Sequence, residues 1–146
     1  MSRPRVLIVC TGNSARSQMA ERLLRHEGGD RFEVYSAGTD PGTLRPEAVA
    51  VMKEMSIDIS QQRSKSLDLF LGQPFDYVIT VCDRAREKCP AFPGEMLRLH
   101  WPFDDPAAAG PSAEDRIRAF RNVRDSIHAR VMFFLGEGSY EVKSPT

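Results

Sequence analysis

The sequence is poor in cysteine, since only Cys10, Cys82 and Cys89 occur in 146 residues. In a reducing compartment a static disulfide is not expected, and any pairing among these cysteines would be transient and catalytic. Long apolar runs are also lacking, and none approaches the roughly 18–20 residues of a membrane-spanning helix. The apolar stretch after residues 1–5 is too short for a secretory signal. We therefore expect a cytoplasmic protein with no membrane contact.

A surplus of charge is absent as well, because twenty basic residues balance twenty acidic residues. This balance lacks the excess of lysine and arginine that is typical of nucleic-acid binding proteins. With 41% hydrophobic residues, the chain is long enough to bury a core without metal or disulfide support. We expect a monomer with a single catalytic domain over residues 1–140 and a C-terminal tail over residues 141–146.

Apolar runs alternate with helical patterns along the chain. The runs that read as strands cover residues 6–9, 32–35, 77–81 and 96–101. Helical patterns cover residues 17–26, the segment from Pro46 through Met55, a short stretch after Ser66, and the stretch between Ser112 and Gly136. Ser112 is a typical N-cap and Gly136 a typical stop. Strands that alternate with helices predict an α/β fold, with a parallel sheet covered on both faces.

One short loop carries the most specific signal. It joins the first predicted strand to the first predicted helix and reads Cys10-Thr11-Gly12-Asn13-Ser14-Ala15-Arg16-Ser17. Backbone N–H groups of such a loop and the positive end of the helix dipole converge on one point. We predict that residues 11–16 bind a tetrahedral oxyanion there, with Gly12 supplying the tight turn.

Cys10 is the predicted nucleophile at this point. Arg16 follows six residues later and offers two parallel donors to the oxygens of an anion. These positive surroundings are expected to lower the thiol pKa from about 8.5 to between roughly 3.5 and 7.5. Ser17 adds a hydroxyl that can donate to the thiolate. The alternative is an inert, buried Cys10 with Arg16 on a solvated helix.

Residues 10–21 resemble the loop shared by low-molecular-weight protein tyrosine phosphatases and thioredoxin-coupled arsenate reductases. The resemblance extends over nearly the whole chain and implies a three-layer sandwich around a four-stranded parallel sheet. The reductase branch is favoured by Cys82 and Cys89, seven residues apart, and by the segment His100-Trp101-Pro102-Phe103-Asp104-Asp105-Pro106. Alanines at 107–109 stand where the phosphatases usually carry an aromatic pair.

The resemblance implies a three-cysteine relay that reduces arsenate to arsenite. Cys10 attacks arsenic while Asp105 acts as general acid, with neighbouring Asp104 as a rival for that role. Cys82 then attacks Cys10, and Cys89 attacks Cys82. Thioredoxin is the implied external reductant, and no bound cofactor or metal is implied.

Other interpretations remain open at this point. The chief rival is a phosphatase in which Cys82 and Cys89 are incidental, and a non-catalytic redox or metalloid sensor would use the same loop. Zinc binding by Cys82, Cys89 and His100 is a further alternative. Some relatives bind potassium through residues that match Asn13, Glu21, Ser36 and an acidic residue at position 65. This chain has Lys65, so we expect an ammonium in place of that cation and little or no potassium dependence.

The spacing of Cys82 and Cys89 makes a prediction about conformation. Residues 83–88 read as a turn of helix that ends before Pro90, and seven residues of helix rise by about 10 Å. A disulfide requires Cα atoms within about 4.4–6.8 Å, so forming Cys82–Cys89 should unwind this segment. Amide NMR spectra of the reduced and oxidised protein should differ over residues 82–92, and identical spectra would contradict the unwinding.

Overall fold

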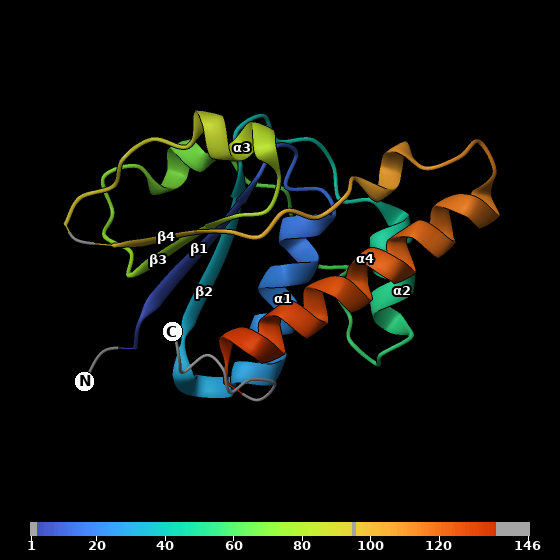
Figure 1. Cartoon of the computed structure of the whole chain (residues 1–146), viewed down its shortest axis with the longest axis horizontal. Helices are drawn as coiled ribbons and strands as arrows, with labels where there is room; N and C mark the ends of the chain where they lie inside the picture. Colours follow the sequence, from blue (N-terminus) through green and yellow to red (C-terminus); the bar gives the residue numbers. More distant parts are fainter. Residues whose placement is uncertain (1–2, 95, 137–146) are drawn as a thin grey trace.

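The computed structural model describes residues 3–94 and 96–136. Four strands form one sheet: β1 (Arg5–Cys10), β2 (Glu33–Gly38), β3 (Tyr77–Thr80) and β4 (Leu97–His100). All neighbouring strands pair in parallel, in the order β2-β1-β3-β4 (Figure 1). The predicted four-stranded parallel sheet is thereby confirmed, with β1 at its centre and β4 at one edge.

Helices cover both faces of the sheet. The α-helices are α1 (Arg16–Gly28), α2 (Pro46–Lys53), α3 (Asp83–Lys88) and α4 (Ala113–Phe134), and short 3-10 helices are η1 (Gly29–Arg31), η2 (Leu67–Phe70) and η3 (Pro106–Ala108). Figure 1 shows α1, α2 and α4 on one side of the sheet and α3 on the other. Within the two described ranges, no helix has the length and apolar content needed to span a bilayer.

Local signals explain most element ends. Pro46 occupies the first turn of α2, and Ser112 caps α4 by accepting a hydrogen bond from the Asp115 amide at 3.0 Å. Gly136 follows α4 with a φ of 87°. The predicted second helix is too long, however, because α2 ends at Lys53 and Met55 lies in the following turn. The predicted boundary between domain and tail at residues 140–141 lies outside the described residues.

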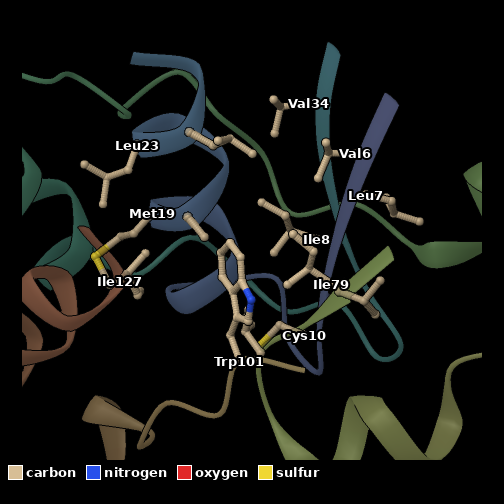
Figure 2. Close-up of a cluster of buried hydrophobic side chains, with 14 of the residues drawn as sticks. Val6, Leu7, Ile8, Cys10, Met19, Leu23, Val34, Ile79, Trp101 and Ile127 are labelled. Atoms are coloured by element: carbon tan, nitrogen blue, oxygen red, sulfur yellow. The ribbon is translucent and has the colours of Figure 1, made fainter. Parts of the chain in front are cut away.

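The core forms where the central strand meets α1 and α4. Val6 to Val9 are fully buried, as a strand covered on both faces requires. Figure 2 shows part of this cluster, with Ile8 and Ile79 from the sheet, Met19 and Leu23 from α1, and Ile127 from α4. This packing fixes the carboxyl end of β1, where the chain turns from Cys10 into α1.

Gly38 at the end of β2 is expected to be intolerant of substitution. A Cβ atom there would lie 2.5 Å from the carbonyl oxygen of Thr11, so Gly38→Ala must push the strand end away from the loop. We expect a loss of about 1–3 kcal/mol in the free energy of unfolding. Gly42→Ala is the matched control because a Cβ atom at Gly42 meets nothing within 4 Å. Urea unfolding would show equal losses in both variants if the close approach at Gly38 were unimportant.

Candidate active site

The loop after β1 turns its carbonyl groups away from the end of the strand. Four of these carbonyls accept a backbone hydrogen bond from the segment that follows β2. The bonds, of 2.9 to 3.1 Å, pair Cys10, Thr11, Gly12 and Ser14 with Thr39, Asp40, Gly42 and Arg45, respectively. Because C=O and N–H point in opposite directions across a planar peptide, the N–H groups of this loop face the opposite side. A set of donors is thus directed at one concave point beside Cys10.

Asn13 holds this conformation in place. Its backbone is left-handed, with a φ of 49°, and the residue is fully buried. Its Nδ2 donates to Ser17 Oγ at 2.7 Å and to Ser36 Oγ at 2.9 Å, while Oδ1 accepts from the Lys65 amide at 2.8 Å. Gly12 was expected to supply the tight turn, but the strained position is Asn13, a residue type that tolerates this region because its side chain hydrogen-bonds locally.

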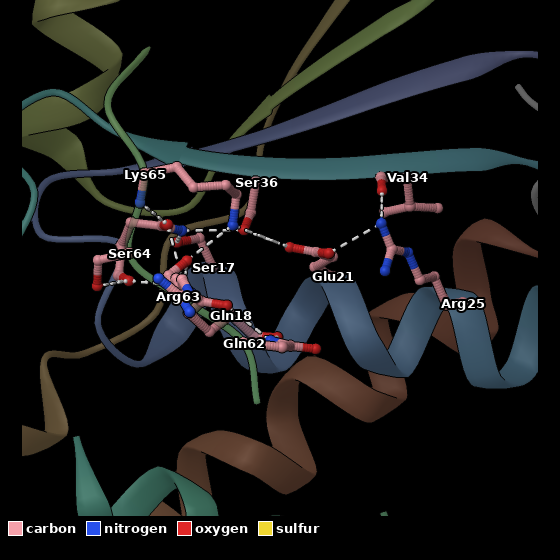
Figure 3. Close-up of polar contacts among 11 residues, drawn as sticks. Ser17, Gln18, Glu21, Arg25, Val34, Ser36, Gln62, Arg63, Ser64 and Lys65 are labelled. Carbon is pink, nitrogen blue, oxygen red and sulfur yellow. Dashed lines mark hydrogen bonds and ion pairs between the residues drawn. The ribbon is translucent and has the colours of Figure 1, made fainter. Parts of the chain in front are cut away.

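Two glutamines that the sequence reasoning missed extend this network (Figure 3). The fully buried Gln18 donates to the carbonyl oxygen of Asn13 at 3.0 Å and to that of Arg63 at 2.7 Å. Gln62 donates in turn to Gln18 Oε1 at 2.6 Å. No spacing in the sequence links these positions, since residues 62 and 63 are far from the loop along the chain.

Lys65 neutralises the buried carboxylate of Glu21, as the sequence predicted. Its Nζ lies 3.8 Å from Glu21 Oε1, and Arg25 lies 3.0 Å from Glu21 Oε2. Ser36 donates to the same carboxylate (Figure 3). Burial lowers the pKa of Lys65, and the negative charge of Glu21 opposes that shift. Two cations therefore already occupy the surroundings of the carboxylate that would otherwise attract a metal cation.

Helix α1 begins without a side-chain cap. Its N-cap residue is Ala15, whose methyl group cannot accept a hydrogen bond from the first helical N–H groups. These free donors point the same way as those of the preceding loop. Together with the helix dipole they form a site that suits a tetrahedral oxyanion. Binding of such an anion by residues 11–16 stays a prediction.

Arg16 connects this loop to the segment that carries Asp105. Its guanidinium donates to the Phe103 carbonyl oxygen at 3.0 Å, which brings the segment after β4 to the first turn of α1. Asp105 is exposed and caps η3, with Oδ1 accepting from the Ala107 amide at 3.0 Å. Asp104 is exposed too and lines an open groove of about 750 Å³ against α4. The role of Asp105 as general acid stays a prediction.

Ser17 is buried in the first turn of α1. Its hydroxyl oxygen accepts the hydrogen bond from Asn13, which leaves the hydroxyl proton free to be donated. Donation of that proton to the sulfur of Cys10 stays a prediction.

Cys10 and Cys82 lie next to each other at the carboxyl ends of β1 and β3. Both thiols are buried, and Thr11 Oγ1 lies 3.3 Å from Cys82 Sγ. The neighbouring Cys82 thiol raises the pKa of Cys10, and burial raises it further, against the lowering effect of Arg16. The neighbouring Cys10 thiol lowers the pKa of Cys82 to about 5, with help from Thr11. The two thiols therefore titrate as a coupled pair that shares one proton above a pH of about 5.

This result corrects the expected pKa of Cys10. The positive loop was expected to lower it, but the neighbouring Cys82 and burial raise it. The pKa of Cys10 is raised because Cys82 competes for the same negative charge. Cys82 has Thr11 and the amide of Ala85 in α3 as further hydrogen-bond donors.

Cys89 lies at the far end of the short helix α3. It is half-buried, ends the helix and packs against the core. All three cysteines are free thiols in this structure. Within residues 3–94 and 96–136 no three histidine, cysteine or acidic side chains gather as metal ligands.

His100 is a further residue that sequence reasoning left without a partner. Its Nδ1 lies 2.7 Å from Thr80 Oγ1, and its Nε2 lies 2.9 Å from Asp83 Oδ1. Asp83 is the first residue of α3 and directly follows Cys82. His100 therefore contacts both sides of the chain around that cysteine.

The chain resembles known proteins over almost its full length. The family model of low molecular weight phosphotyrosine protein phosphatases matches residues 5–143. A protein named arsenate reductase from Shouchella clausii is 46% identical over 138 residues, which cover 94% of this chain and 99% of that protein. A solved arsenate reductase in its oxidised state is 30% identical with a TM-score of 0.78, covering 92% and 98% of the two chains. A thioredoxin-dependent arsenate reductase from Corynebacterium glutamicum is 29% identical with a TM-score of 0.72, covering 92% and 61%.

The shared proton predicts an unusual titration. Since the pKa of Cys82 is lowered to about 5, one thiolate per chain should persist from neutral pH down to that value. Ultraviolet absorbance of the thiolate measures it. In the Cys10→Ala variant the largest lowering contact is lost, so the transition should move to higher pH. The Cys89→Ala variant should behave like the parent, and absorbance that appears only in the alkaline range would contradict a shared proton.

Proposed function

The chain belongs to the low molecular weight phosphotyrosine protein phosphatase family, and from that premise we propose that it is a thioredoxin-dependent arsenate reductase. The observation that carries the proposal is the pair of neighbouring thiols, Cys10 and Cys82, beside a loop that suits an oxyanion. A phosphatase needs only one nucleophilic sulfur at that point. A second, neighbouring sulfur supplies what a two-electron reduction requires.

In the proposed first step, arsenate binds to the N–H groups of the loop and to the guanidinium of Arg16. The Cys10 thiolate attacks arsenic, and an arsenic–oxygen bond breaks as Asp105 protonates the leaving oxygen. Water is released and a thioester of arsenate remains on Cys10. Arsenic is still in its pentavalent state after this step. Because the attack needs the thiolate on Cys10, the proton that the two sulfurs share must move to Cys82 when the anion binds.

In the second step Cys82 attacks the sulfur of Cys10. The electron pair of the sulfur–arsenic bond goes to arsenic, which leaves as trivalent arsenite, and a Cys10–Cys82 disulfide forms. The contact with the Cys10 thiol is lost at this stage, but Thr11 and the backbone amide of Ala85 still lower the pKa of Cys82 and favour its reactive thiolate form. Cys89 then attacks Cys82, which frees Cys10 and leaves a Cys82–Cys89 disulfide.

The cycle closes when an external dithiol reduces Cys82–Cys89. Support for thioredoxin in this role comes from the thioredoxin-dependent relative described above. Cys89 is half-buried at the end of a helix of only six residues, and such a short helix unwinds at small cost. The proposed chemistry needs a reducing compartment, so a cytoplasmic location is part of the proposal.

Weak hydrolysis of aryl phosphates is the expected side activity. Phosphate has the shape and charge of arsenate, and the family as a whole is named for phosphatases. Hydrolysis needs Cys10 and Arg16 but neither of the other cysteines. This difference separates the two chemistries experimentally.

The decisive experiment follows NADPH oxidation by purified protein with thioredoxin, thioredoxin reductase and arsenate. We expect many turnovers for the parent and none for Cys82→Ser or Cys89→Ser. The Cys82→Ser variant stops the relay at the arsenate thioester on Cys10, and the Cys89→Ser variant stops it at the Cys10–Cys82 disulfide. Hydrolysis of a small aryl phosphate by both variants should stay near the parental rate.

The contrary result is equally clear. Absence of arsenate-dependent oxidation, together with aryl phosphate hydrolysis that needs Cys10, would identify a phosphatase whose other cysteines are incidental. A single stoichiometric oxidation without turnover would indicate a redox or metalloid sensor.

A further inference from the structure

The segment between Cys82 and Cys89 is held to the edge strand β4 at both ends. At its start, His100 Nε2 contacts Asp83 Oδ1 at 2.9 Å. At its end, the guanidinium of Arg98 donates to the carbonyl oxygen of Pro90, the residue after Cys89. Residues two apart on a strand point to the same face, so Arg98 and His100 reach the segment from one side.

Of these two contacts, the one between His100 and Asp83 is held more firmly. Its side chain is only 19% exposed, and its other nitrogen lies 2.7 Å from Thr80 Oγ1 on β3. A carboxylate only accepts hydrogen bonds, so Asp83 requires the proton on Nε2. In the neutral ring Nδ1 then accepts from the Thr80 hydroxyl. The ring is thus held by β3 and in turn holds the first residue of α3.

These contacts belong to the arrangement in which α3 is helical and both cysteines are reduced. Closing the Cys82–Cys89 disulfide moves Cys89, and with it Pro90, toward Cys82 and unwinds α3. The two ends of the segment cannot come together while each keeps its present contact with β4. At least one of the two contacts is therefore lost when the disulfide forms.

We propose that Arg98 and His100 are positioning residues that stabilise the reduced Cys82–Cys89 segment and so make its disulfide easier to reduce. This inference rests on the relay of the proposed function. It adds which residues set the equilibrium between the Cys82–Cys89 disulfide and the two free thiols, which is the last step of that relay. A contact present only in the reduced form shifts the thiol–disulfide equilibrium toward the dithiol by its own free energy. Without it, the reduced segment would give up its electrons more readily and the external dithiol would regenerate it less completely.

The test measures this equilibrium without arsenate. The full chain in a Cys10→Ser background is equilibrated with mixtures of reduced and oxidised dithiothreitol, so that only Cys82–Cys89 can form. Two electrons and two protons pass from dithiothreitol to the two sulfurs on reduction. Free thiols are then trapped by alkylation and counted by mass spectrometry.

His100→Ala should shift the equilibrium toward the disulfide by about threefold to tenfold, the range of one net hydrogen bond. A tenfold shift corresponds to a reduction potential lower by about 30 mV. Asp83→Ala should give a similar shift, and the double variant should add little to either single change. His100→Gln, whose amide can still donate to Asp83, should recover part of the parental value.

His128→Ala is the matched control. Its Nε2 lies 2.8 Å from Glu27 Oε2 and joins α4 to α1, far from the cysteines along the fold. Losing this comparable contact should lower the thermal stability without moving the redox equilibrium. A merely structural role for His100 predicts the same behaviour for both variants.

An unchanged equilibrium in His100→Ala would overturn the inference and leave the proposed arsenate reduction untouched. Conversely, a shifted equilibrium in a protein that does not turn over arsenate would sustain the inference about this segment and refute the proposed function. Failure of the Cys82–Cys89 disulfide to form at any ratio would contradict both.

Discussion

The site depends on the left-handed backbone of Asn13. A side chain with both a donor group and an acceptor is needed there, because the amide must bind two hydroxyls and also accept from the backbone of Lys65. If this residue returned to an ordinary conformation, the carbonyls on either side would rotate and the loop would no longer present its N–H groups together. The glutamines and serines around it make that rotation costly, since buried polar groups would lose their partners. The anion site is therefore built before any anion arrives.

The second constraint is that two sulfurs share one proton. Attack on arsenic requires the negative charge on Cys10, while attack on the resulting thioester requires it on Cys82. Before the first attack, exchange of the shared proton between the neighbouring sulfurs can place the charge on Cys10 without bulk solvent. After that attack Cys10 is bonded to arsenic, and Cys82 must give up its proton to another base. Arg16 and Thr11 lower the pKa of both cysteines, whereas the backbone amide of Ala85 in α3 lowers that of Cys82. The start of α3 thus favours the thiolate of Cys82, which suits its attack in the second step.

Contiguous features of the site were predictable from the sequence, and features assembled from distant segments were not. The strand, loop and helix around Cys10 follow each other directly, so the oxyanion loop and the parallel sheet were both expected. The position of Cys82 near Cys10 followed from parallel strands that end at one edge. By contrast, the partners of Asn13 come from residues 36 and 65, and His100 meets Asp83 only because β4 lies beside β3. The pKa of Cys10 was predicted with the wrong sign because the loop was considered without its neighbouring thiol.

The separation of the loop from α3 has a consequence for how this family can diverge. The proposed anion loop is one continuous stretch at the end of the central strand, whereas the proposed exchange from Cys82 to Cys89 uses one short segment after β3. Cys82 and Ala85 of that segment belong to the core cluster, so substitutions there must still fill the core. Hydrolytic and reductive descendants can therefore arise from one ancestor by changes in this one segment that preserve its buried positions, while the inherited anion loop is kept.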